Sequence, residues 1–362
     1  MTKDALKWLM VIAVLVASIS QSCVHGAPQV PCFFIFGDSM ADNGNNNLLL
    51  TSAKVNYAPY GIDYPGGVTT GRFSNGKTTV DILAEFLGFE TPIPPFATTN
   101  VQDIVKGLNY ASGAAGILTE TGSNLGGHIS LDQQLLNHQI TVLRIASILR
   151  ANTLQTLQYL NKCLYTVGMG NNDYINNYFM PQFYPTSKRY TPEQYASILI
   201  DQYTTQILTL YNKYGARKVA LVGLGLIGCT PNAISKTRGT TCVDELNSAA
   251  QLFNQKLVPL VDQLNTNLTD AKFIYVNSTG MSSGDPTSVG FKVLNVGCCP
   301  VNSVGQCIRS GTPCQNRSEY VFWDSFHPTE ASNRITAFRT YKSVDPTDNY
   351  PMDVSHLVQL KL

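Results

Sequence analysis

Short apolar runs alternate with longer stretches of helical periodicity along most of the chain. The short runs are rich in β-branched and aromatic residues, are apolar on both faces and end near Gly, Ser or Asn. This pattern is typical of inner strands in a parallel sheet that is covered on both sides. We therefore predict strands at Cys32–Phe36, Gly107–Ala111, Cys163–Val167, Lys218–Val222 and Lys272–Val276.

Amphipathic stretches lie between these runs and predict helices. In Ser130–Leu149 the apolar positions form a broad helical stripe. The alternation of strand and helix indicates one α/β domain, residues 27–362, built on a parallel sheet. No repeat, low-complexity tract or linker divides it. The predicted helices are Thr78–Leu87, Ser130–Leu149, Pro192–Tyr214 and Val243–Leu268.

Ligands of such folds bind at the carboxyl ends of the strands, so the residues that follow each strand are the first candidates for chemistry. Gly37-Asp38-Ser39 follows the first predicted strand. A serine at this turn has its hydroxyl and its backbone N–H at the working edge of the sheet. The alternative is a serine that only caps a helix.

A second candidate, Asn172, follows the third predicted strand in Gly168-Met-Gly-Asn-Asn172-Asp. Its amide can donate a hydrogen bond to a developing oxyanion. The alternative is an ordinary turn, because Gly and Asn both tolerate left-handed backbone.

Asp324 and His327 stand three residues apart in Trp-Asp324-Ser-Phe-His327-Pro near the C-terminus. One short loop holds both side chains on the same side. The aspartate then accepts from one imidazole nitrogen and leaves the other free to act as a base. His128 in a Gly-rich loop, His138 in a predicted helix and His356 in the tail lack this combination of spacing and setting.

One rival nucleophile is Ser282, because Gly280-Met-Ser282-Ser-Gly284 matches G-x-S-x-G. That motif needs a strand before it and a helix after it. A strand precedes it, but Asp285-Pro286 and further loop residues are expected in place of the helix. We therefore do not expect Ser282 to be catalytic.

The amino-acid composition limits the classes of molecule that the protein can be expected to bind. Hydrophobic residues make up 44% of the 362 residues and charged residues only 14%. Beyond residue 26 the 23 basic and 23 acidic residues balance, which excludes a general basic surface for nucleic acid. No H-E-x-x-H or P-loop motif is present, and no G-x-G-x-x-G follows the first predicted strand, so we expect no metal and no cofactor. Small or neutral substrates are the expected partners.

Residues 1–26 are typical of a secretory signal peptide. Lys3 and Lys7 precede the 11-residue apolar core Leu9–Ile19, which is shorter than the ~20 residues of a membrane span. An uncleaved anchor is the alternative. We predict a secreted, extracellular protein (apoplast or cell wall) without stable membrane insertion.

Eight cysteines remain beyond the signal, and an even number in a secreted chain favours disulfides. Cys298, Cys299, Cys307 and Cys314 crowd into one loop, where zinc is the alternative, but their spacing contains no C-x-x-C pair. Cys229 and Cys242 are the best further pair, whereas Cys32 and Cys163 are expected to be buried thiols. The sequons at Asn267, Asn277 and Asn316 are predicted glycan acceptors.

Four segments together resemble the conserved blocks of GDSL-type esterases/lipases of the SGNH hydrolase superfamily. They are FFIFGDSMADNGNN (33–46), NYASGAAGI (109–117), YTVGMGNNDY (165–174) and VFWDSFHPTE (321–330). Residues 56–78 and 176–184 resemble the secreted plant branch in particular. The resemblance implies a flavodoxin-like three-layer α/β/α sandwich with a central, mostly parallel five-stranded sheet.

The resemblance also implies roles for individual residues. Ser39 matches the nucleophile, His327 the general base, Asp324 its partner and Asn172 the oxyanion-hole asparagine. The other oxyanion donors would be the Ser39 N–H and one N–H of the second block, from Gly113 or from Ala114, which stands where many relatives have Gly.

The implied activity is a secreted serine esterase/lipase that hydrolyses acyl-lipid type esters through an acyl-enzyme. One alternative is an extracellular acyltransferase of the cutin-synthesis type that uses the same residues. Another is a non-catalytic secreted glycoprotein that binds an acyl or carbohydrate ligand. The complete Ser, Asn, Asp and His set argues against the last.

Overall fold

The computed structural model describes residues 26–99, 103–237 and 241–362. The predicted signal peptide lies, up to residue 25, outside the described residues. In the described part a central sheet has the strand order β1-β2-β3-β4-β7. Strands β1 to β4 are parallel and β7 pairs antiparallel with β4, so the predicted α/β fold with a mostly parallel five-stranded sheet is confirmed. The strands are β1 (Phe33–Gly37), β2 (Leu164–Gly168), β3 (Lys218–Val222), β4 (Lys272–Val276) and β7 (Asn349–Tyr350).

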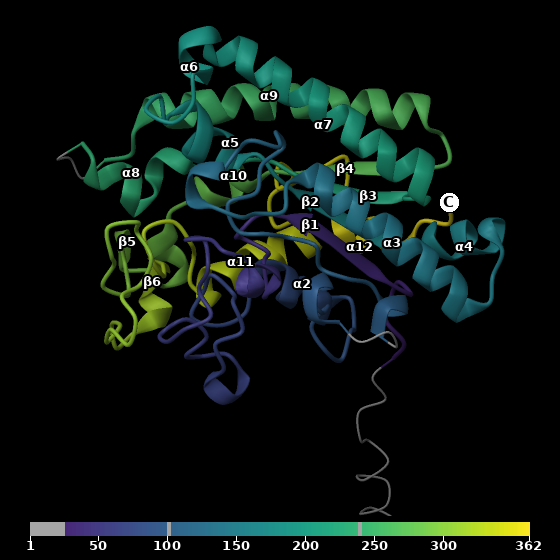
Figure 1. The fold of residues 1–362 in the computed structure, drawn as a ribbon, viewed down its shortest axis with the longest axis horizontal. Helices are drawn as coiled ribbons and strands as arrows, with labels where there is room; N and C mark the ends of the chain where they lie inside the picture. The colour runs from purple at the N-terminus through teal and green to yellow at the C-terminus, as the bar shows by residue number, and fades with distance from the viewer. Residues whose placement is uncertain (1–25, 100–102, 238–240) are drawn as a thin grey trace, which may run out of the picture.

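Helices cover both faces of this sheet (Figure 1). Alternate side chains of each strand enter different apolar cores, as the two-residue period of a strand requires. In β1, Phe34 and Phe36 belong to one core, and Phe33 and Ile35 to the other. The first core is covered by α3 (Leu131–Leu149), α4 (Thr153–Leu160), α7 (Pro192–Tyr214) and α9 (Asp244–Asn267), and the second by α2 (Thr79–Phe86), α10 (Ser278–Ser282), α11 (Glu330–Tyr341) and α12 (Val354–Gln359). The other short helices are α5 (Asn171–Asp173), α6 (Thr186–Arg189) and α8 (Pro231–Ser235).

Local capping explains where three of the four predicted helices begin. Thr78 caps α2, Ser130 caps α3 and Thr191 caps α7, each by accepting a backbone N–H of the first turn. Helix α7 ends at Gly215, whose φ of 73° is the left-handed conformation that a glycine adopts at little cost. The helix boundaries read from the sequence are thus confirmed to within a residue or two.

The predicted strand Gly107–Ala111 is wrong. This segment runs beside β1, but Asn109 makes only isolated bridges, to Ile35 and to Pro95. The Asn109 side chain donates to the Ala41 carbonyl and accepts the Ala111 N–H, and it thereby links this segment to the loop after β1. The fifth strand is instead β7 at the opposite edge, and a separate small parallel sheet is formed by β5 (Val293–Gly297) and β6 (Tyr320–Phe322).

All eight cysteines in the described part of the chain pair as disulfides. Cys229–Cys242 and the pairs inside the cysteine-rich loop, Cys298–Cys314 and Cys299–Cys307, agree with prediction. The expectation of buried thiols at Cys32 and Cys163 is wrong, because these two residues form the fourth disulfide. They directly precede Phe33 and Leu164, which are register partners of β1 and β2, so the parallel pairing itself brings the two sulfurs together.

A third apolar cluster lies beneath the cysteine-rich loop and includes Tyr57, Tyr60, Phe73, Trp323 and the loop's own disulfides. It packs β6 and the loop 320–328 against residues 55–73. No helix in the described part of the chain is long and apolar enough to cross a membrane.

Candidate active site

The strand register brings the predicted site residues to one edge of the sheet. Gly37, the last residue of β1, pairs with Gly168, the last residue of β2. Ser39 and Asn172 follow these two ends and line the same cleft. The loop after β6 brings His327 and Asp324 to this edge from the far end of the sequence.

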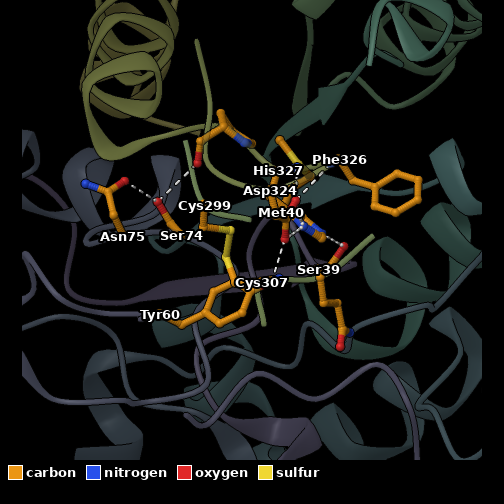
Figure 2. A network of polar contacts seen from close by, with 12 residues as sticks. Ser39, Met40, Tyr60, Ser74, Asn75, Cys299, Cys307, Asp324, Phe326 and His327 are labelled. Carbon is orange, nitrogen blue, oxygen red and sulfur yellow. Dashed lines mark hydrogen bonds and ion pairs between the residues drawn. A yellow bond between two sulfur atoms is a disulfide. The ribbon is translucent and has the colours of Figure 1, made fainter. Parts of the chain in front are cut away.

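Ser39, His327 and Asp324 form one hydrogen-bonded chain (Figure 2). The Ser39 Oγ lies 2.8 Å from Nε2 of His327, and Nδ1 of His327 lies 2.8 Å from Oδ2 of Asp324. The carboxylate can only accept, so Nδ1 carries the proton and Nε2 is left with a lone pair for the serine hydroxyl. This is the arrangement that serine hydrolases use.

The Asp324 carboxylate is fully buried and satisfied entirely by donors. Its Oδ1 accepts the backbone N–H groups of Phe326 and His327, each at 2.8 Å. Its Oδ2 accepts the Tyr60 hydroxyl at 2.7 Å. Our sequence analysis missed Tyr60, and no local signal pointed to it, because 264 residues separate the two partners.

The cleft at Ser39 has a volume of about 1990 Å³. Its lining is largely apolar, but polar and charged side chains such as Asn176, Asn247 and Arg339 also border it. Ligand pockets of ordinary size have ~300–1,000 Å³, so this cleft exceeds what a short ester would need. Apolar lining residues include Phe73, Met169, Ile175, Leu226, Ile227 and Phe326.

Asn172 is buried beside Ser39, and one amide N–H donates to the Ala115 carbonyl at 3.0 Å. Its Oδ1 accepts the Asn176 amide at 2.7 Å, which orients Nδ2 and leaves its second N–H unassigned. The backbone N–H groups of Ser39 and Ala114 have no hydrogen-bond partner in the described part of the structure, and both residues line the cleft.

Gly113 does not offer a free donor, contrary to our expectation for the second block. Its backbone N–H donates to Oδ2 of Asp42 at 2.9 Å. The neighbouring Ala114 has a φ of 69°, a left-handed conformation that is costly for a residue with a Cβ. Because the Gly113 N–H is occupied, the neighbouring N–H of Ala114 is the available donor of this segment.

Buried carboxylates hold both ends of the loop 113–118, which contains Ala114 and is called the donor loop below. Oδ1 of Asp42 accepts the N–H groups of Gly44 and Asn45, and burial raises the pKa of Asp42 to about 6. Asp173 accepts the N–H groups of Ile117 and Leu118 at 2.8 and 3.0 Å, and burial raises its pKa to about 7. Loss of solvation outweighs the stabilising N–H donors in both cases.

None of the rival residues contacts the Ser39–His327–Asp324 chain, although Ser282 also lines the cleft. Ser282 ends the short helix α10, a helix that we did not expect there, and its hydroxyl donates to the Ser278 carbonyl. His138 is buried among aromatic rings, and burial lowers its pKa to about 3. Asp353 and His356 repeat the three-residue spacing at 2.7 Å, a pair that we overlooked, but they lie on α12 and not on the cleft. Within the described residues no cluster of His, Cys, Asp and Glu is placed to hold a metal.

The fold and this site together define an α/β protein with a hydrogen-bonded Ser–His–Asp chain in a cleft at one edge of its sheet. Comparison with known proteins identifies the family: the GDSL-like Lipase/Acylhydrolase family matches residues 33–339. Among curated proteins of Arabidopsis thaliana, GDSL esterase/lipase At1g29670 is 52% identical over 98% of both chains. GDSL esterase/lipase At1g29660 is 50% identical over 98% of both chains. GDSL esterase/lipase At5g45670 is 48% identical over 97% of this chain and 99% of its own.

The chain therefore belongs to the GDSL-like lipase/acylhydrolase family. The resemblance to plant GDSL esterases/lipases, and with it the prediction of a carboxylic ester hydrolase, is confirmed at the level of the family.

Proposed function

We propose that the protein is a secreted serine esterase that cleaves long-chain acyl esters, with Ser39 as nucleophile, His327 as general base and Asp324 as the partner of His327. The observation that carries this proposal is the continuous hydrogen-bonded chain Ser39–His327–Asp324 at the mouth of an apolar cleft.

The reaction follows from the geometry. Nε2 of His327 takes the Ser39 proton as Oγ attacks the ester carbonyl, and Asp324 stabilises the imidazolium that results. His327 then gives this proton to the departing alcohol, which leaves an acyl group on Ser39. Water then loses its proton to the same nitrogen as its oxygen attacks the acyl carbonyl. The bond between Oγ and the acyl group breaks, His327 returns the proton to Ser39 Oγ, and the carboxylic acid leaves.

The oxyanion of each tetrahedral intermediate needs donors next to Ser39. We assign the backbone N–H groups of Ser39 and Ala114 and the free amide N–H of Asn172, because all three residues line the cleft beside the serine. Losing one such donor typically reduces the rate by ~10²–10³-fold.

The cleft supports an acyl substrate with a long apolar chain. Each methylene that leaves water contributes ~0.8 kcal/mol, so an extended chain along Met169, Ile175 and Leu226 gains affinity with every carbon that it buries. A short acyl group would leave most of the 1990 Å³ to water.

Secretion of a single hydrolase domain, residues 27–362 behind a signal peptide at 1–26, is part of the proposal. Four disulfides support an oxidising compartment. Asn267 and Asn316 are exposed and suit glycans. Asn277 suits one poorly, because its Oδ1 caps α10 and its amide donates to the Thr347 carbonyl.

The test is hydrolysis of p-nitrophenyl butyrate and p-nitrophenyl palmitate by the secreted protein, with Ser39→Ala as the control. We expect turnover that favours palmitate and disappears in Ser39→Ala without loss of folded protein. Turnover that survives in Ser39→Ala would refute the assignment. A wild type that releases p-nitrophenol only when an acceptor alcohol is added would point to acyl transfer, and bound ester without any turnover would point to a binding protein.

A further inference from the structure

We infer that Tyr60 is a positioning residue of the triad, which holds the Asp324 carboxylate in the orientation that His327 requires. This inference rests on the proposed function. It assigns a fourth member to the chain of polar contacts, supplied by residues 56–78, a segment outside the four blocks that contain the predicted site residues.

The contact is short and buried. The Tyr60 hydroxyl donates to Oδ2 of Asp324 at 2.7 Å, and only 1% of the Tyr60 side chain is exposed. Figure 2 shows the ring below the triad, with its hydroxyl directed toward Asp324. Burial, together with the nearby Asp324 charge, raises the pKa of Tyr60 well above its usual range. The hydroxyl is therefore a neutral donor at every working pH.

Asp324 depends on this donor because it has no cationic partner except a protonated His327 among the described residues. His327 Nδ1 lies about equally far from both carboxylate oxygens, 2.9 Å from Oδ1 and 2.8 Å from Oδ2. Two backbone N–H groups hold Oδ1, whereas Oδ2 has only Tyr60 besides the imidazole. Without the hydroxyl, a fully buried oxygen that bears charge would lose its one fixed donor.

Tyr60 is itself fixed by the cysteine-rich loop. Its oxygen accepts the backbone N–H of Cys307 at 3.0 Å, and Cys307 is bonded to Cys299. The ring packs edge-on against Tyr57 and Trp323, at centroid distances of 5.4 and 6.5 Å. Because one lone pair accepts from Cys307, the O–H is directed at Asp324. The disulfide loop thus acts on the triad through Tyr60.

The chain contains a matched control. The Tyr57 hydroxyl donates to the carbonyl of the same Cys307 at 3.0 Å, in the same apolar cluster, but it makes no hydrogen bond to Asp324. Tyr57→Phe and Tyr60→Phe therefore each remove one buried hydroxyl that contacts the cysteine-rich loop. Only Tyr60→Phe removes a donor from the triad.

The experiment measures kcat and KM for p-nitrophenyl palmitate in wild type, Ser39→Ala, Tyr57→Phe and Tyr60→Phe, each normalised to folded protein by near-ultraviolet circular dichroism. We expect kcat of Tyr60→Phe to fall ~10–100-fold, the range for a hydrogen bond to a charged group, with KM unchanged within about twofold. We expect Tyr57→Phe to keep the wild-type kcat. A purely structural role would lower thermal stability in both variants and leave kcat per folded molecule alone.

The outcomes separate the two proposals. If Ser39→Ala abolishes turnover but Tyr60→Phe matches Tyr57→Phe in kcat, the positioning role of Tyr60 is refuted and the esterase mechanism stands. If the wild type neither turns over the ester nor reacts with a phosphonate at Ser39, both proposals fail.

If Tyr60→Phe does not fold, proton NMR of the wild type decides. We expect the far-downfield Nδ1 proton of His327 to show a nuclear Overhauser contact to a slowly exchanging tyrosine hydroxyl proton that is still present in Tyr57→Phe. Absence of that hydroxyl signal would overturn the inference.

Discussion

We predict that the substitution Asp42→Asn changes the stability of the protein little but strongly lowers its activity. The Asp42→Asn substitution keeps the shape of the side chain and lets Oδ1 still accept the N–H groups of Gly44 and Asn45. The new NH₂ group faces the N–H of Gly113, so two donors meet where a carboxylate oxygen accepted. The loop that carries Ala114 must then shift.

Two terms of similar size act on the free energy of unfolding. Burial raises the pKa of Asp42 from 3.8 to about 6, so above pH 6 its ionised form destabilises the fold by about 3 kcal/mol, at ~1.4 kcal/mol per pKa unit. The amide removes this destabilisation. The unpaired Gly113 N–H costs ~1–3 kcal/mol in the opposite direction. At pH 8 we therefore expect a change in stability of less than about 2 kcal/mol.

We expect Asp42→Asn to lower activity more than stability, because the shift of the loop displaces the proposed oxyanion donor, the Ala114 N–H. We expect kcat to fall by ~10²–10³-fold at pH 8. Between pH 3.8 and 6 the unfolded chain has lost the proton that folded Asp42 keeps, so the wild type gains stability as the pH falls through this window. The variant lacks this gain, and its stability relative to the wild type should decrease from pH 6 to pH 4.

The assay combines urea unfolding at pH 4, 6 and 8 with kcat at pH 8. Asp353→Asn is the control, since Asp353 is also a buried carboxylate that accepts backbone N–H groups, from Ser343 and His356, but on α12. We expect Asp353→Asn to lower stability and keep kcat per folded molecule. A full kcat in Asp42→Asn would show that the Gly113–Ala114 loop does not depend on this carboxylate.

Three further predictions concern the donor loop and the core. Ala114→Gly should keep kcat within about threefold, because the proposed donor is a backbone N–H and the φ of 69° is easier for glycine; a large loss in steady-state assays would remove Ala114 from the oxyanion site. Asn172→Ala should reduce kcat by ~10²–10³-fold with a smaller effect on KM, and an unchanged kcat would contradict its role. Burial lowers the pKa of His138 to about 3 from 6.5, so its contribution to stability is lost as the pH falls from 6.5 toward 3. His138→Asn, although less stable at pH 7, should therefore lose less stability than the wild type between pH 6.5 and 4 in urea titrations, and parallel curves would refute this.

The elements with strong local patterns could be predicted from the sequence. The parallel strands β1 to β4 are short apolar runs, and helices α2, α3 and α7 each have an apolar stripe and a side-chain cap, which for α7 is Thr191. Strand β7 has only two residues and no apolar run, so its place at the sheet edge comes from the docking of the C-terminal segment. Residues 107–111 have strand composition, and Leu108 and Tyr110 do exchange backbone hydrogen bonds with Ile35, but this pairing is limited to an isolated bridge.

The site was predictable to the extent that its residues follow strand ends. Ser39 and Asn172 meet because the neighbouring parallel strands β1 and β2 end at one edge of the central sheet. The Asp324–His327 pair reaches the same edge on the loop after β6, which belongs to the separate small sheet. The conformation of the donor loop could not be predicted from the sequence, because the hydrogen bond between Gly113 and Asp42 joins residues 71 positions apart. The Cys32–Cys163 disulfide likewise depends on the register of β1 with β2, which apolar runs do not specify. The hydrogen bond from Tyr60 to Asp324 could not be predicted for the same reason, because its partners are far apart in the sequence.

The central claim is that Ser39 is the nucleophile of this site. Its most direct test is to react the secreted protein with a p-nitrophenyl alkylphosphonate and to locate the covalent adduct by peptide mass spectrometry. We predict one adduct, on Ser39, which is absent in Ser39→Ala and forms much more slowly in His327→Ala. An adduct on Ser282, or none at all in protein that hydrolyses the palmitate ester, would contradict the account.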